Sequence, residues 1–256
     1  MSFPNFPNKH EKPSLVTPEV FMKYRKKIGR YPTFQPPRSV IFCYDRRLHE
    51  YILKNESTKK LEGFFGDFYL LEDTNHEIAV IANFGIGAPI IAILVEELAV
   101  FGVKAFLSIG VAGSLQESAQ LGSVIVCDRA IRDEGTSHHY IRSEKYSFPS
   151  KSMLRRIEVA IKKMGLEVNF GTTWTIDAPY RETVAEAAKY RDEGVLTVDM
   201  EVAALFVVAK YRNVDAGALF TISDYLMETQ WKPEFHLTEE HLQTLFLIAK
   251  KSLMTP

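Results

Sequence analysis

The stretch EIAVIANFGIGAPIIAILVEELAVF, residues 77–101, decides the fold class of this chain. Its first eight residues are apolar nearly throughout and predict a buried β-strand, whereas residues 89–101 have the apolar spacing of a helix. Pro89 stands at the start of that helix, where a missing N–H is harmless. Gly85 and Gly87 lie in the turn between the two elements. A strand that passes through a tight turn into a helix is typical of α/β proteins.

The same alternation continues from residue 39 to the C-terminus. Further apolar strands are predicted at SVIFCYD, VKAFLSIG, SVIVCD, EVNFGTTW, VLTVD and DAGALFTISD, and helices near 151–164, 181–192, 200–212 and 238–252. Strands that are apolar on both faces indicate a sheet covered by helices on both sides. We therefore predict one three-layer α/β/α domain over residues 39–256.

Residues 1–38 are predicted to form an N-terminal arm. Seven of the 12 prolines fall before residue 38, which favours extended chain with one short helix near residues 18–28. Such an arm can wrap around a neighbouring subunit. The start of the chain lacks the charged and apolar pattern of a secretory signal, and no apolar run reaches the ~18 residues of a membrane span.

The composition favours small-molecule chemistry. The 256 residues include 31 basic and 32 acidic side chains, a formal net charge of -1 without long runs of either sign, so neither nucleic acid nor a membrane surface is an expected partner. The two cysteines lie in apolar runs and favour a cytoplasmic location. The adjacent pair His138 and His139 does not have metal-ligand spacing, and no metal is predicted.

Polar residues and glycines follow the predicted strands, and this is where open α/β sheets bind ligands. The strand exits carry Asp45-Arg46-Arg47, NFGIGAP, IGVAGSL, TIDAPYRET, VDME and TISDYL. The glycines Gly85, Gly87, Gly110 and Gly113 can present backbone N–H groups to an anion. Taken alone, glycine at these positions is better explained by ordinary turn geometry.

Six segments in order resemble the nucleoside phosphorylase and uridine phosphorylase superfamily: FGIGAP, SIGVAGSLQESAQLGSVIV, AIRDEGTSHHY, TTWTIDAPY, VDMEVAALFVVA and GALFTISD. The resemblance covers roughly residues 78–231 and implies a central mixed, twisted sheet and a homo-oligomer between dimer and hexamer. It also implies phosphorolysis of a purine nucleoside to free base and ribose 1-phosphate. Phosphate is then a co-substrate, and no cofactor is implied.

The resemblance implies that the acids after residue 198 hold the sugar. Glu201 matches the position that accepts hydrogen bonds from ribose hydroxyls, and Met200 matches a residue that packs against the sugar. A carboxylate there would stabilise the oxocarbenium character of the transition state. Asp199 either holds a hydroxyl as well or caps the following helix.

The resemblance also implies that Asp224 protonates the departing base and that Ser223 orients it, because protonation makes a nucleobase a better leaving group. A turn-capping role is the structural alternative for Asp224. The Ser-Asp pair matches the purine branch of the family, and the Gln and Arg that read uracil are missing after Tyr180. Further nucleoside contacts are predicted for Tyr180, Trp231 and Arg181, although Arg181 is equally consistent with a surface charge at a helix start. Trp174 and Tyr225 are further candidates for stacking on the base.

The phosphate site departs from the family pattern. Ser108 stands where the family has a phosphate-binding arginine, and Val111 stands where it has a hydroxyl residue. The turns at Gly85 and Gly110 still mark the side from which phosphate would attack. Arg47, or Arg46, can replace the missing charge, although a basic pair that opens a helix is typical of a solvated surface.

Two alternative functions therefore remain open. In a nucleoside hydrolase, Asp45 at the end of the first strand would position water as a general base, unless it is a helix cap. In a non-catalytic nucleoside-binding protein, the scaffold would persist without the chemistry. The loss at Ser108 favours these two readings, whereas Glu201 and Asp224 favour the two enzymes.

Overall fold

The structure, a computed structural model, describes residues 6, 9–226 and 230–255. Its α-helices are α1 (Pro18–Lys27), α2 (Arg46–Asn55), α3 (Ala88–Phe101), α4 (Lys151–Met164), α5 (Val184–Asp192), α6 (Val202–Arg212) and α7 (Glu239–Met254). Its strands are β1 (Ser39–Cys43), β2 (Thr58–Leu61), β3 (Asp67–Leu71), β4 (Ile78–Ala82), β5 (Ala105–Ser114), β6 (Val124–Asp133), β7 (Tyr146–Ser147), β8 (Asn169–Ile176), β9 (Thr197–Asp199), β10 (Asp215–Leu226) and β11 (Trp231–Pro233).

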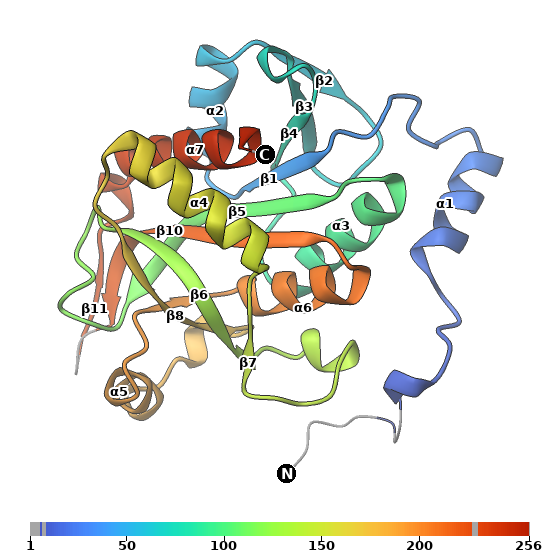
Figure 1. Cartoon of the computed structure of the whole chain (residues 1–256). Coiled ribbons are helices and arrows are strands. Elements are labelled where there is room, and N and C mark those ends of the chain that lie inside the picture. Colours follow the sequence, from blue (N-terminus) through green and yellow to red (C-terminus); the bar gives the residue numbers. More distant parts are fainter. Residues whose placement is uncertain (1–5, 7–8, 227–229, 256) are drawn as a thin grey trace.

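The strands form one mixed sheet, as the resemblance implied. β1 lies parallel to both β4 and β5, and β10 lies parallel to β5. Antiparallel pairs join β10 to β6 and β5 to β9. The sheet is flanked by helices, so the predicted three-layer α/β/α class is confirmed (Figure 1).

One half of the sheet closes on itself, which the sequence analysis did not predict. β5, β10, β6, β8 and β9 pair in a ring that returns to β5. Register shifts between Ile222 and Asp224 and between Cys127 and Arg129 interrupt two of these pairings. Such irregularities bend a strand and let its two halves pair with different neighbours.

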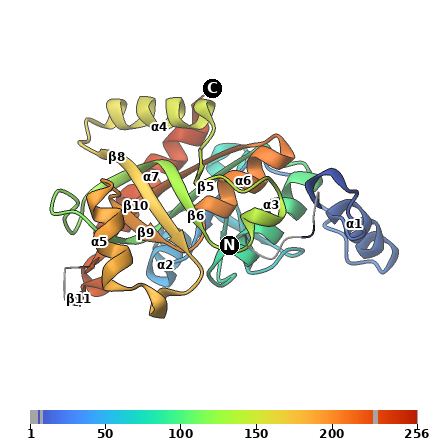
Figure 2. The ribbon, with the colours of Figure 1, turned by 90° about the horizontal axis from the view of Figure 1, so that it is seen from below.

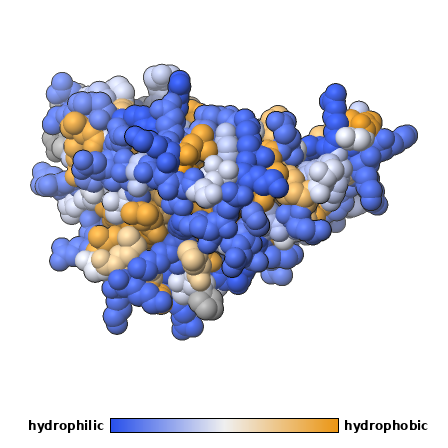
Figure 3. All heavy atoms as spheres, turned by 90° about the horizontal axis from the view of Figure 1, so that it is seen from above, coloured by the Kyte–Doolittle hydropathy of each residue, from blue (hydrophilic) through white to orange (hydrophobic). Residues whose placement is uncertain are grey.

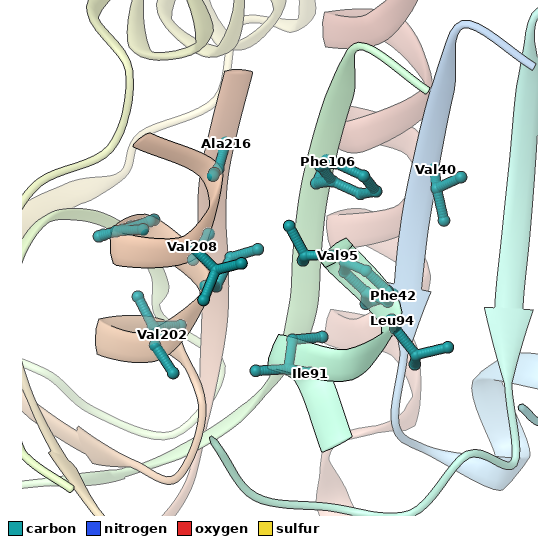
Figure 4. Packing of buried hydrophobic residues seen from close by; sticks show 14 of the residues in the cluster. Val40, Phe42, Ile91, Leu94, Val95, Phe106, Val202, Val208 and Ala216 are labelled. Atoms are coloured by element: carbon teal, nitrogen blue, oxygen red, sulfur yellow. The ribbon is translucent and has the colours of Figure 1, made fainter. Parts of the chain in front are cut away.

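Helices cover both faces of the sheet. α3 and α6 lie on one face, and α2, α4 and α7 lie on the other (Figure 1). On the first face the rings of Phe42 and Phe106 stack at a centroid distance of 5.6 Å and lie near Ile91 and Val95 of α3 (Figure 4). Both phenylalanines are fully buried, and burial of such a side chain contributes about 1.5–3 kcal/mol. Tight packing here fixes the direction in which the strands leave the core.

Two helices begin later than predicted because side chains cap them. The helix predicted at 200–212 begins at Val202, since the Asp199 carboxylate accepts the N–H groups of Glu201 and Val202. The helix predicted at 181–192 begins at Val184, since Thr183 and Glu186 form a capping box. Both caps satisfy backbone donors that the first turn leaves unpaired.

The sequence analysis missed β2, β3, β7 and β11. β2 and β3 form an antiparallel pair at one end of the sheet, and β7 and β11 are only two and three residues long. These strands are short or partly exposed and therefore lack the continuous apolar run that marks a central strand.

The N-terminal segment carries α1, which begins at Pro18 after the Thr17 cap. α1 lies at the margin of the molecule, away from α5, which sits beside β8 and β9 (Figures 1 and 2). Arg25 of α1 pairs with Glu97 of α3 at 3.4 Å, and Glu19 pairs with Arg212 of α6 at 2.7 Å. These ion pairs hold α1 against the domain.

The face seen in Figure 3 is largely hydrophilic, with small separate apolar areas. Within the described part of the chain, no helix has both the length and the apolar content to cross a membrane.

Candidate active site

A cavity of about 590 Å³ lies at the strand exits that the sequence analysis singled out. The volume is in the range of small-molecule sites. Its walls come from β5, from the segment that leads into α5, from the β9–α6 junction and from the end of β10. The cavity brings together the predicted residues Ser108, Gly110, Val111, Tyr180, Asp199, Met200, Glu201, Ser223, Asp224 and Trp231. Asp45, Arg47, Gly85 and Arg181 are not among its lining residues.

The Glu201 carboxyl group is anchored by the glycine turn before α3. Its Oε1 accepts a hydrogen bond of 2.5 Å from the N–H of Gly87, the residue that caps the N-terminus of α3. Burial, with a smaller effect of the Asp199 charge, raises the pKa of Glu201 to about 8. The acceptor at the glycine turn is therefore the Glu201 carboxyl group of the chain itself.

Asp199 is saturated by donors from the protein. One carboxylate oxygen accepts the Thr173 and Thr175 hydroxyls at 3.0 and 2.7 Å. The other accepts the N–H groups of Glu201 and Val202 at 2.9 and 2.7 Å. Of the two roles considered for Asp199, the structure shows the helix cap, and a direct ribose contact has no free acceptor to use.

Asp224 is held from both sides by Ser223 and Trp231. The Ser223 hydroxyl donates to Asp224 Oδ1 at 2.6 Å, and the Trp231 indole N–H donates to Oδ2 at 2.7 Å. β10 continues past Asp224 to Leu226, so the aspartate does not cap a turn. A side chain at Gly113 of β5 would lie 3.0 Å from Asp224 Oδ2, so a glycine there leaves room for the carboxylate. Trp231 was expected only as a stacking residue, and its N–H contact adds a positioning role.

Tyr44 lies against Ser108 and Gly110, two of the residues predicted for the phosphate side of the site. Its hydroxyl lies 3.3 Å from the Ser108 Oγ, and a Cβ on Gly110 would stand 3.3 Å from its ring. Burial, followed by the nearby Glu201 charge, raises the pKa of Tyr44 well above its usual value. The sequence analysis did not single out Tyr44, because an aromatic residue after an apolar strand gives no catalytic signal.

Asp45 and Arg47 form hydrogen bonds to other parts of the protein. Asp45 caps α2 by accepting the N–H groups of Arg47 and Leu48. The Arg47 guanidinium donates to Asp45 Oδ2, to the Phe235 carbonyl and to the Thr238 hydroxyl. The Arg47 pairing and these backbone bonds outweigh burial and lower the pKa of Asp45, which opposes a general-base role. The predictions that these two residues serve water or phosphate do not fit this geometry.

Some of the other predicted residues lie away from the cavity, and others line it. Arg46 is exposed and pairs with Glu50 at 2.9 Å. Trp174 is fully buried and donates to Asp133, so it cannot stack on a base in the cavity. Arg181 lies in the neighbouring cleft together with Asp177 and Glu186. Tyr180, Trp231 and Phe235 are exposed aromatic residues that line the cavity, and the first two remain the predicted candidates for stacking.

The cavity is acidic. Glu182, Asp199, Glu201 and Asp224 line it, and no Lys or Arg side chain does so among the residues that the structure describes. Glu182 was not predicted, because no motif marks it. Across the described ranges, no group of His, Cys, Asp and Glu has the arrangement of a metal site. A cavity with several carboxylates and aromatic rims suits a ligand with hydroxyl and N–H donors.

An α/β fold with a small-ligand cavity at its strand exits defines a broad class of enzymes, and comparison with known proteins narrows it. The profile of the Phosphorylase superfamily matches residues 46–252. The chain belongs to this superfamily, which confirms the resemblance found in the sequence.

Relatives in sequence include two phosphorylases. A DeoD-type purine nucleoside phosphorylase of Streptococcus gordonii is 30% identical over 216 residues, which cover 82% of this chain and 85% of that protein. A guanosine phosphorylase of Halorubrum lacusprofundi is 33% identical over 147 residues, 57% of this chain, and the match spans 61% of that protein.

Among solved structures, the AMP nucleosidase of Bacteroides thetaiotaomicron is similar with a TM-score of 0.72 and 26% identity, covering 93% of this chain and 96% of that one. A uridine phosphorylase of Vibrio fischeri has a TM-score of 0.73 at 26% identity, covering 86% and 91%. The similar proteins thus include both phosphorylases and a nucleosidase.

Proposed function

We propose that this chain cleaves the N-glycosidic bond of purine nucleosides. The observation that carries the proposal is the single cavity that holds Glu201 and Asp224, each fixed by hydrogen bonds. The Glu201 carboxylate would accept the ribose hydroxyls, and Met200 would pack against the sugar. Hydroxyl donors favour the ionised carboxylate, so bound ribose would lower the raised pKa of Glu201. The charge would then stabilise the oxocarbenium-like sugar.

Asp224 would supply the proton to the departing base. Ser223 and Trp231 fix both carboxyl oxygens in this cavity, so the acid is aimed before substrate arrives. General acid catalysis of this kind contributes typically 10²–10⁴-fold in rate. The Ser223-Asp224 pair and the lack of a uracil-reading Gln and Arg support a purine as the base.

Water is the acceptor that the cavity favours. A phosphate dianion would meet acidic side chains and no cation among the described lining residues, so nothing there would offset its charge. Tyr44 and Ser108 offer neutral hydroxyls at the side where an acceptor would enter. In the hydrolysis, a C–O bond forms between water and the anomeric carbon, the C–N bond breaks, and the base leaves with the proton from Asp224. The attacking water releases one proton, which replaces the proton that Asp224 gave to the base.

Phosphorolysis is the second candidate, and the names of the similar phosphorylases favour it. It requires cations that another subunit would have to supply, as in a homo-oligomer that completes its site across subunits. The products would then be free base and ribose 1-phosphate.

The test is release of free base from adenosine, inosine, guanosine and uridine, with and without phosphate. Phosphate-independent release of ribose from the purine nucleosides is the expected result. Strict phosphate dependence with formation of ribose 1-phosphate would establish the second candidate. The variants Glu201→Gln and Asp224→Asn should each lose at least 10²-fold in kcat/KM, and unchanged turnover in both would refute the site assignment.

A further inference from the structure

Arg191, in the last turn of α5, joins two strands of the cavity wall. Its Nε donates to the Leu115 carbonyl at 3.0 Å, and its Nη2 donates to the Leu226 carbonyl at 2.6 Å. Leu115 directly follows β5, and Leu226 is the last residue of β10. Both strands carry residues of the cavity, whereas the reaction proposed above gives Arg191 no role.

The guanidinium group lies where the pairing of these two strands ends. β10 runs parallel to β5, a register shift follows Ile222, and the pairing then continues to Tyr225 opposite Ser114. Leu226 and Leu115 are the next residues of the two strands. A register shift disrupts the ladder locally, so a second link between the strand ends has an effect there. The planar guanidinium presents its N–H groups in a fixed fork and can hold two carbonyls together, which a lysine ammonium group cannot do with the same geometry.

The backbone of α5 is tied to the end of β5 as well. The Gln116 side-chain amide donates to the carbonyls of Arg191 and Val195 at 2.8 and 3.2 Å. The Leu115 N–H donates to the Leu196 carbonyl at 2.9 Å. The end of α5 and the end of β5 therefore form one unit, and the bond from Arg191 to β10 joins the third element to it.

The position of Leu226 affects the carboxyl group of Asp224. β10 and β11 are antiparallel, and Leu226 lies opposite Trp231, whose indole N–H donates to Asp224 Oδ2 at 2.7 Å. Leu226 also packs closely on β5, since a Cβ on Gly113 would stand 2.6 Å from its Cδ1. A displacement of Leu226 from β5 would therefore move Trp231 and weaken the bond that fixes Asp224.

We propose that Arg191 is a positioning residue for Asp224: by holding Leu226 against the end of β5, it keeps the Trp231 N–H on the Asp224 carboxyl group. The inference rests on the proposed function, because it takes Asp224 as the acid that protonates the base. A basic residue in the last turn of a helix is also favourable for the helix itself. That simpler role requires only a positive charge, so Arg191→Lys separates the two.

The first test follows Trp231 without any substrate. The sequence has two tryptophans, and Trp174 is fully buried whereas Trp231 is 59% exposed, so acrylamide quenching of the fluorescence reports chiefly on Trp231. Arg191→Met and Arg191→Lys should both raise the quenching constant. Arg156→Met is the matched control, because Arg156 binds Asp215 at the opposite end of β10 at 3.2 Å. It should keep the wild-type quenching constant.

The second test compares two leaving groups. Inosine requires protonation of its base, whereas the nitrophenolate of 4-nitrophenyl β-D-ribofuranoside leaves without a proton. Arg191→Met and Arg191→Lys should lower kcat for inosine roughly tenfold and leave kcat for the nitrophenyl riboside nearly unchanged, since they impair only the general acid. Arg191→Met combined with Trp231→Phe should be no slower on inosine than the slower single variant, because both changes act on the same bond.

The outcomes separate this inference from the proposed activity. Wild-type quenching in both Arg191 variants would overturn the inference, whatever the turnover. Equal losses on the two substrates would overturn it as well, because they indicate general damage to the fold, and wild-type behaviour of Arg191→Lys would reduce the role to a helix-end charge. A wild-type protein that cleaves neither substrate would refute the proposed function, while raised quenching in the variants would still support the link from Arg191 to Trp231.

Discussion

Replacement of Asp199 by alanine should destabilise the protein far more than replacement of a second capping aspartate. Asp199 is 7% exposed and accepts two hydroxyl and two backbone N–H donors from β8 and the start of α6. The variant would leave the N–H groups of Glu201 and Val202 buried without acceptors. Each such group costs about 1–3 kcal/mol.

The two threonine hydroxyls can rotate toward other acceptors, and removal of a buried charge recovers part of the loss. The net cost is therefore about 3 kcal/mol, a large share of the ~5–15 kcal/mol that stabilises a typical domain. Asp45→Ala is the matched control, because Asp45 also caps a helix through two N–H groups. Its side chain is 20% exposed, so water can replace the cap and the cost should be about 1 kcal/mol.

Urea unfolding of the two variants and the wild type measures the difference. The midpoint for Asp199→Ala should fall by roughly 1 M, with the slope unchanged, and the midpoint for Asp45→Ala should fall by about a third of that. Equal losses in the two variants would show that burial and the threonine contacts add nothing to the Asp199 cap. An Asp199→Ala variant with wild-type stability and a strongly raised KM would instead identify Asp199 as a ribose contact.

Three further predictions concern the cavity and its surroundings. Trp231→Phe should lower kcat roughly tenfold with little change in the urea midpoint, since it removes one hydrogen bond to Asp224 and keeps the ring. Arg47→Ala should lower stability but leave the phosphate dependence of turnover unchanged, because the guanidinium is bound by protein acceptors and Arg47 does not line the cavity. In Glu201 the pKa is raised from 4.5 to about 8, so its contribution to stability is present at low pH and is lost as the pH rises toward 8. Unfolding of Glu201→Gln across pH 5–9 should lack that decline.

The central strands were predictable because their apolar runs report burial on both faces. β1, β4 and β5 have this property. The closure of β5, β6, β8, β9 and β10 was not predictable, since it depends on bulges and on the bending of long strands.

The candidate site was predictable where a motif marks it. Glu201 and the Ser223-Asp224 pair were named from such motifs, and the structure brings them to one cavity. Their roles in binding and catalysis stay predictions. Tyr44 and Glu182 were missed, because only the fold brings them into the cavity, near Ser108 and Asp224 respectively.

For Asp45 and Arg47 the sequence suggested a role in the reaction, whereas the structure shows hydrogen bonds between the two residues. Their place at a strand exit suggested chemistry, but an aspartate just before a helix and an arginine two residues later satisfy each other locally. Sequence spacing alone does not distinguish a helix cap from a general base, because both require a carboxylate at the same point of the chain.

The most direct measurement is the fate of oxygen during cleavage of a purine nucleoside in water enriched in ¹⁸O, with phosphate present. Our account predicts one labelled oxygen at the anomeric carbon of free ribose, produced at a rate that does not depend on phosphate; mass measurement within a few turnovers avoids exchange of the label. Ribose 1-phosphate as the sugar product, without the label, would contradict water as the acceptor.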